Sequence, residues 1–117
     1  ILLFKKSKME NRIYQAVLSK VCHSIDTTDS FEEFEDIMQN RAYRLILIDY
    51  SNTSFDAQKI LNIVQTSYEL HNFKSKVVLF VEPNIKIPTH IKAQFALMIH
   101  TNISKSDLEN QIKELLQ

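Results

Sequence analysis

Short runs of continuously apolar residues alternate along this chain with segments that have helical periodicity. The clearest run is Lys76–Val81, which reads KVVLFV and has no polar position after its first residue. A strand that is covered by helices on both faces is expected to be apolar without alternation. Because strand and helix patterns succeed one another from the first residues to the last, the sequence predicts an α/β fold with one parallel sheet between two layers of helices.

The same pattern predicts five strands and five helices. We expect strands within residues 1–4, 22–26, 44–50, 76–81 and 96–100. We expect helices over residues 8–21, 31–42, 55–71, 89–95 and 107–116. In the first helix the residues spaced four apart, and therefore expected to face the core, are Met9, Ile13, Val17 and Val21.

Polar residues mark several of the expected helix ends. Ser30 with Glu33, and Ser106 with Glu109, have the spacing of capping boxes, which satisfy backbone N–H groups of a first helical turn. His71 and Asn72 are expected to end the third helix. The chain has no glycine, so backbone positions with positive φ are expected at asparagines in turns. These asparagines are Asn40, Asn52, Asn72, Asn84 and Asn102.

Composition excludes several classes of protein. Fourteen basic residues balance fourteen acidic ones, and this neutrality argues against a nucleic-acid-binding domain or a polybasic membrane binder. No apolar run approaches the ~18 residues that a membrane span needs. The single cysteine, Cys22, rules out an internal disulfide and is expected to be a small buried residue, so we expect a cytoplasmic setting. The chain lacks an initial Met and starts in mid-strand, so we expect residues 1–117 to be one domain of a longer protein.

Chemistry-bearing residues follow the expected strands where each one ends. They are Lys5 and Lys6 after the first strand, Asp49 at the third, Glu82 after the fourth and Thr101 after the fifth. The carboxyl ends of parallel strands lie at one edge of the sheet, where functional groups of such folds collect. The strand-end residues are therefore the candidate site.

The order and spacing of these segments resemble the receiver domain of bacterial two-component signalling, over the whole chain. DYSNTSFDA places an aspartate at the end of the third strand and Asp56 seven residues later, VVLFVEP is similar to the fourth strand of receivers, and LENQIKELL to their closing helix. The resemblance implies a doubly wound, flavodoxin-like (βα)5 fold with strand order 2-1-3-4-5. It also implies that Asp49 occupies the position of the phosphoacceptor.

The other functional positions of the family are changed in this sequence. Lys5 and Lys6 replace the two adjacent acids that bind Mg²⁺ in receivers, and Glu82 replaces the Thr or Ser that ends the fourth strand. Thr101 stands in place of the lysine that ends the fifth strand, and Met98 in place of an aromatic residue within it. The resemblance therefore implies a degenerate pseudo-receiver.

Electrostatics gives these changes a physical consequence. Protonated lysines offer no lone pair to Mg²⁺, and two unit charges ~4 Å apart interact by about 4 kcal/mol at an effective dielectric constant of about 20. We expect Lys5 or Lys6 to pair with Asp49, so that metal binding and phosphorylation are lost. The domain is then no enzyme and holds no cofactor; it is a regulatory module in a response regulator or hybrid sensor histidine kinase. The alternative is a genuine phosphoacceptor, phosphorylated on Asp49 in a phosphorelay.

The resemblance also implies where partners bind. Receivers use the face of the fourth helix, fifth strand and fifth helix, which here predicts Ile91, Phe95, Met98 and Ile112 as a docking surface for a partner protein or for other domains of the same chain. Members of the family often dimerise through this face, so a homodimer stays open.

Other kinds of site find less support in the sequence. An unrelated flavodoxin-like enzyme or ligand binder stays a third alternative, although glycine-rich phosphate loops are absent. The histidines His23, His71, His90 and His100 lack the spacing of a zinc site. The run from Lys5 to Lys8 is expected to be a solvated loop and only alternatively an anion cradle.

Overall fold

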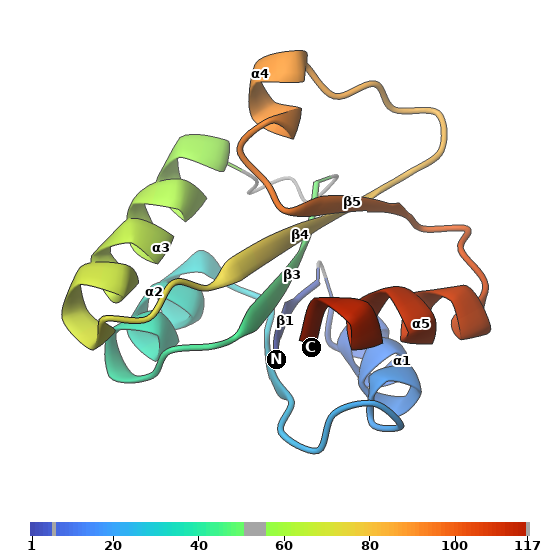
Figure 1. Cartoon of the computed structure of the whole chain (residues 1–117), viewed down its shortest axis with the longest axis horizontal. Helices are drawn as coiled ribbons and strands as arrows, with labels where there is room; N and C mark the ends of the chain where they lie inside the picture. Colours follow the sequence, from blue (N-terminus) through green and yellow to red (C-terminus); the bar gives the residue numbers. More distant parts are fainter. Residues whose placement is uncertain (6, 51–55, 117) are drawn as a thin grey trace.

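A computed structural model describes residues 1–5, 7–50 and 56–116 of the chain. One five-stranded sheet with parallel neighbours has the order β2-β1-β3-β4-β5 (Figure 1). The strands are β1 (Leu2–Phe4), β2 (Asp26–Thr28), β3 (Leu45–Asp49), β4 (Lys76–Val81) and β5 (Leu97–His100). The predicted fold class and strand order are confirmed.

Five helices alternate with these strands. They are α1 (Lys8–Leu18), α2 (Phe31–Asn40), α3 (Ala57–His71), α4 (Thr89–Lys92) and α5 (Lys105–Leu116). Helices α1 and α5 cover one face of the sheet, whereas α2 and α3 cover the other (Figure 1). Within the described ranges, none of the helices combines the length and the hydrophobicity needed to span a bilayer.

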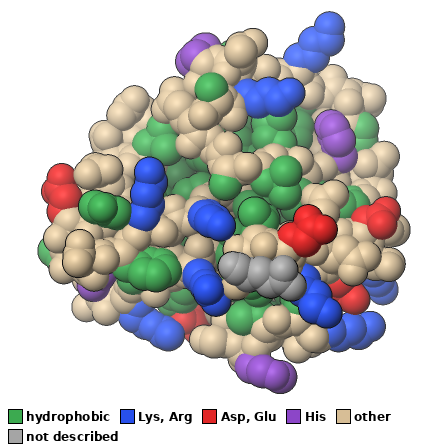
Figure 2. Space-filling view, in the orientation of Figure 1, with side chains coloured by type: hydrophobic (Ala, Val, Ile, Leu, Met, Phe, Trp, Pro, Cys, Tyr) green, Lys and Arg blue, Asp and Glu red, His purple; other side chains and the backbone are tan. Residues whose placement is uncertain are grey.

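The sheet separates two hydrophobic clusters, because side chains of a strand alternate between its two faces. Leu2, Phe4, Ile46 and Ile48 contact the α2 and α3 side, together with Phe34. Leu3, Leu45, Leu47, Val78 and Phe80 contact the α1 and α5 side. This two-sided burial explains why β3 and β4 are continuously apolar in the sequence. The surface shown in Figure 2 carries charged side chains of both signs with hydrophobic side chains between them.

The structure corrects the predicted orientation of the first helix. Met9 and Ile13 were expected in the core, but they are 73% and 54% exposed. Val17 is buried as predicted and Val21 packs partly buried against the same cluster, whereas Asn11 and Leu18 take the other inward positions of the helix. A polar residue on the inward stripe hides its periodicity, because hydrophobicity patterns assume that asparagine faces water.

Several predicted boundaries also shift. The first helix ends at Leu18 and not at residue 21, and the second ends at Asn40 and not at residue 42. The second strand was expected within residues 22–26 but is Asp26–Thr28, where two threonines supply the β-branched residues that favour strands. Cys22 lies in the preceding turn, where it is partly buried against the α1 and α5 side. The fourth helix is one turn, shorter than the expected 89–95.

Helix ends follow the capping rules with one change. The hydroxyl of Ser30 accepts a hydrogen bond from the Glu33 N–H at 3.2 Å, as predicted. At α5, however, Ser104 and not Ser106 accepts from a first-turn N–H, that of Asp107 at 3.1 Å. Asn72 ends α3 with φ of 53°, and among the described residues it alone has a positive φ. Of the other asparagines proposed for this role, Asn52 lies outside the described residues.

The edge strand β2 is tied to the start of β3 by a polar cluster. The Tyr43 hydroxyl donates a hydrogen bond to Asp26 Oδ2. Arg41 Nη1 donates to the same oxygen at 2.8 Å. Burial, the hydrogen bond to Asp26 and the negative charge of Asp26 together raise the pKa of Tyr43 from its ordinary 10.0 to about 12. The neutral phenol is thus favoured in the folded chain.

This raised pKa predicts a loss of stability in alkali. The unfolded chain releases the Tyr43 proton at lower pH than the folded chain. The stabilisation that neutral Tyr43 gives to the folded chain is therefore complete below pH 10 and disappears as pH rises through about 12. Urea unfolding between these pH values should show a steeper decline for the wild-type chain than for Tyr43→Phe. Equal slopes for the two chains would contradict the assignment.

Candidate functional site at the ends of β1 and β3

Two oppositely charged residues meet where β1 and β3 end. Asp49 is the last residue of β3, and Lys5 directly follows β1. The parallel register pairs Phe4 with Ile48, so the residues that follow them, Lys5 and Asp49, lie next to each other at the carboxyl end of the sheet. Lys5 and Asp49 are only 1% and 2% exposed. A charged pair at this depth is uncommon, since desolvation of both ions costs free energy.

Lys5 Nζ donates a hydrogen bond to Asp49 Oδ1, and the two groups form a buried ion pair. The prediction that a lysine from the end of the first strand pairs with Asp49 is confirmed for Lys5. Lys6, the other candidate, lies outside the described residues. The ammonium of Lys5 therefore holds a fixed positive charge against the carboxylate of Asp49.

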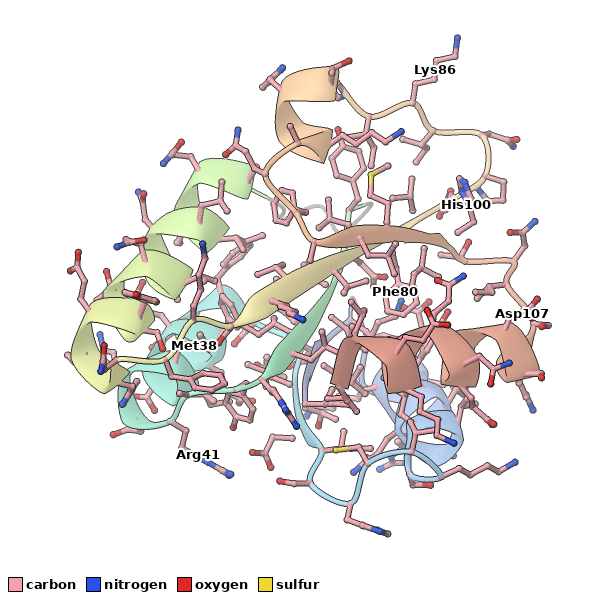
Figure 3. All side chains as sticks on the ribbon, viewed as in Figure 1. Met38, Arg41, Phe80, Lys86, His100 and Asp107 are labelled. Atoms are coloured by element: carbon pink, nitrogen blue, oxygen red, sulfur yellow. The ribbon has the colours of Figure 1, made fainter. Side chains whose placement is uncertain are left out.

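Two aromatic rings enclose the ammonium group. Lys5 Nζ lies 4.2 Å from the ring centroid of Tyr14 and 4.1 Å from that of Phe80. The two rings also contact each other, with centroids 4.9 Å apart. In Figure 3, Phe80 lies on the α5 side of the sheet, which is also the side of α1. Cation–π attraction is strongest for a desolvated ammonium, so the rings offset part of the cost of burying Lys5.

A buried amide fixes the backbone at the same place. Asn11 Oδ1 accepts a hydrogen bond from the Lys5 backbone N–H at 3.3 Å, and Asn11 Nδ2 donates to the Thr28 carbonyl at 3.0 Å. The side chain thus joins the end of β1, helix α1 and the end of β2. This bridge explains why a polar residue occupies the inward stripe of α1.

The pKa of Tyr14 is shifted by the burial and the negative charges of the site. Burial raises the pKa of its hydroxyl, and the negative charges of Asp49 and Glu10 raise it further. A phenolate here would stand close to two carboxylates, so the neutral phenol is the stable form. Tyr14 therefore adds no negative charge to the ion pair.

Sequence reasoning identified Lys5 and Asp49 but not Asn11, Tyr14 or Phe80. Phe80 was assigned only to the core of the fourth strand. The available signal was the spacing of Asn11, Tyr14 and Leu18, which places them on one side of α1. That signal becomes readable only when a polar residue is allowed on the buried face.

The donor set around Asp49 does not fit Mg²⁺. This ion prefers oxygen ligands and near-octahedral geometry, whereas the group beside Asp49 Oδ1 is an ammonium without a lone pair. Across residues 1–5, 7–50 and 56–116, no group of three or more His, Cys, Asp or Glu side chains is placed to hold a metal ion.

The remaining predicted residues belong to the next two strands of the sheet, β4 and β5, or directly follow them. Glu82 directly follows β4 and is exposed. Thr101 follows β5 and is half-buried; its backbone N–H donates to the Val81 carbonyl at 2.9 Å. Met98 packs on the α2 and α3 side of the sheet. Ser7, in the basic run, caps α1 by accepting from the Glu10 N–H.

The predicted partner face is not a single surface. Ile112 is completely buried on the α1 and α5 side of the sheet, and Phe95, 9% exposed, belongs to the cluster on the opposite side. Ile91 and Met98 are half-buried in that second cluster. The prediction was wrong for Ile112 and Phe95, because α5 directs its apolar stripe inward and the residues after α4 fold back onto the sheet.

Comparisons with known proteins show the fold of receiver domains. No protein-family model matches the sequence, and neither does any curated protein. A response regulator receiver domain protein (CheY-like) from Methanospirillum hungatei matches with a TM-score of 0.78 and 15% identity, over 97% of this chain and 90% of that one.

Two further solved structures are similar at the same level. The receiver domain of a sensor histidine kinase from Pseudomonas aeruginosa, with a magnesium ion coordinated in its active site cleft, has a TM-score of 0.76 and 9% identity, over 98% of this chain and 94% of that one. The N-terminal domain of a response regulator/sensory box/GGDEF three-domain protein from Carboxydothermus hydrogenoformans has a TM-score of 0.76 and 15% identity. The match covers 98% of this chain and 91% of that one. At these identities the likeness establishes the CheY-like fold of this chain.

Proposed function

We propose that this chain is a receiver-like domain of a two-component signalling protein that works by docking and not by Mg²⁺-dependent phosphorylation. The observation that carries the proposal is the buried ion pair of Lys5 with Asp49 between the rings of Tyr14 and Phe80. The fold supports the assignment to receivers. The pair supports the assignment to the pseudo-receiver type.

Phosphoryl transfer to a carboxylate needs an accessible oxygen and neutralisation of the phosphoryl charge, to which metal ions contribute strongly. Asp49 Oδ1 already accepts a hydrogen bond from Lys5, and the residue is only 2% exposed. An entering phosphoryl group would have to displace the ammonium from between two rings. This reorganisation opposes the reaction before any bond is formed.

Loss of the metal changes what the domain can contribute to its parent protein. The receiver from Pseudomonas aeruginosa holds a magnesium ion in its cleft, and we propose that here Lys5 supplies the positive charge permanently. The domain then has no catalytic activity and no cofactor of its own. It would act through contacts with other proteins or with neighbouring domains, as a module of a larger signalling chain.

Incubation with acetyl phosphate and Mg²⁺, read by intact mass, tests the proposal. We expect no gain of a phosphoryl group on the wild-type chain, while a receiver with the full acid pair is phosphorylated under the same conditions. A gain that disappears in Asp49→Ala and persists in Asp56→Ala would instead establish Asp49 as a phosphoacceptor. Asp56 is a suitable control because it caps α3 and is exposed.

A further inference from the structure

Opposite charges are concentrated on two helices of this neutral chain. The exposed side of α1 carries Lys8 and Arg12. Helix α2 contains no basic residue and exposes four acids, Glu32, Glu33, Glu35 and Asp36. No ion pair within the described ranges uses any of these six side chains. Lys8 and Arg12 line one pocket together with Asp29 and Glu33 of the same chain. The acids Glu32, Glu35 and Asp36 do not line that pocket, and they are the ones available to another molecule.

The basic residues of α1 flank exposed apolar side chains. Met9 and Ile13 lie one helical turn apart on the same side of α1 and are 73% and 54% exposed. We call Lys8, Met9, Arg12 and Ile13 the α1 surface. Two large apolar side chains exposed side by side favour a contact that removes them from water.

A groove of about 510 Å³ between α2 and α3 has the complementary properties. Polar side chains make up most of its lining, and the apolar part comes from Met38, Ile63 and Leu70. Leu70 is 61% exposed, whereas Met38 and Ile63 are buried beneath the surface of the groove. Glu35 lines this groove and also the neighbouring acidic surface of α2. The basic residue in the lining, Lys59, has its ammonium 4.9 Å from the centroid of the Phe31 ring. We call this site the α2–α3 groove.

We propose that the α1 surface of one copy of this chain docks in the α2–α3 groove of a second copy. Met9 and Ile13 would contact the apolar lining, while Lys8 and Arg12 would face the acids of α2. Both halves of the contact are matched: apolar side chains meet apolar side chains, and a basic rim meets an acidic one. This proposal does not depend on the state of Asp49.

The geometry of the fold requires a second molecule. Helix α1 lies on one face of the sheet, whereas α2 and α3 lie on the other, so the α1 surface cannot enter the α2–α3 groove of its own chain (Figure 1). The contact joins two different surfaces and is therefore heterologous. Heterologous contacts form rings when the rotation closes and extended head-to-tail arrays when it does not.

Sedimentation equilibrium with charge-reversed variants tests the proposal. The average mass of the wild-type chain should rise with concentration at low salt and fall back when salt screens the charges. Lys8→Glu/Arg12→Glu and Glu32→Lys/Glu35→Lys should each lower the association constant by roughly tenfold or more, because like charges then face each other. Mixing the two variants should restore association, since the second keeps the basic α1 surface and the first keeps the acidic groove.

A control with the same change of charge separates a specific contact from a general effect. Lys86→Glu/Lys92→Glu reverses two exposed bases in and near α4 and should associate like the wild-type chain. Circular dichroism of each variant would verify folding, as all substituted residues are exposed. A wild-type chain that stays monomeric at every concentration, or association that the reversals on α1 and α2 leave unchanged, would overturn the proposal.

Discussion

Replacing Asp49 with alanine is expected to lower the free energy of unfolding by about 3–5 kcal/mol, the range for a buried ion pair that loses one partner. The change removes the carboxylate that accepts from Lys5 Nζ and leaves the ammonium in a site that is almost inaccessible to water. The aromatic rings of Tyr14 and Phe80 compensate only part of this cost. Urea unfolding followed by circular dichroism would measure the difference.

Two comparisons make this result specific. Asp107→Ala removes an exposed acid from the first turn of α5 (Figure 3) and should cost only about 0.3–1 kcal/mol. Lys5→Met/Asp49→Leu removes both charges and should restore most of the stability, because replacing a whole buried pair with apolar residues is often neutral or stabilising. A double variant as unstable as Asp49→Ala would show that the pair is not the origin of the effect.

Replacing Phe80 with alanine is expected to lower the free energy of unfolding by about 3–5 kcal/mol through the cavity left in the core. Phe80 is fully buried in the centre of the sheet, on the α1 and α5 side. The substitution also removes one of the two rings that flank Lys5 Nζ. A further loss of about 2 kcal/mol is expected when a desolvated cation–π contact disappears.

Leucine substitutions separate these two contributions. Phe80→Leu keeps most of the apolar volume but removes the ring, whereas Phe34→Leu makes the same change at a buried site on the other side of the sheet. Phe34 contacts the rings of Phe4 and Phe31, and Phe80 contacts that of Tyr14, so the control variant loses at least as much ring–ring contact as Phe80→Leu. Urea unfolding should show the larger cost for Phe80→Leu. Equal costs would mean that the ring contributes nothing to holding Lys5.

The central strands β3 and β4 were predictable because nearly all of their residues are apolar, as expected for strands that are buried on both faces. Residues 45–48 and 77–81 are apolar on both faces, and their shortness and aliphatic composition favour buried strands. Strand β2 was less predictable because an edge strand of three residues depends on its neighbour β1 for its hydrogen bonds. The inward side of α1 was mispredicted because Asn11 is buried there.

Two of the five residues of the candidate site, Lys5 and Asp49, were predictable from the topology of the sheet. Residues at the ends of adjacent parallel strands must lie close together, so the pairing of Asp49 with a lysine after the first strand followed from the strand order. The contributions of Asn11 and Tyr14 could not be predicted in this way. Their positions depend on how far α1 is rotated about its own axis, and hydrophobic periodicity misjudged that rotation.

By itself the sequence determined the order of the elements along the chain and the two-layered core, because short-range periodicity and the rules of parallel sheets are sufficient for these features. The resemblance to receivers added the strand order, which brings Asp49 beside Lys5 or Lys6. Tertiary structure alone decided that Lys5 is enclosed by Tyr14 and Phe80, and that Phe95 packs into the core and not on a partner surface. Those outcomes follow from the packing of helices against the sheet. Packing joins side chains that are distant in the chain, and no local pattern records it.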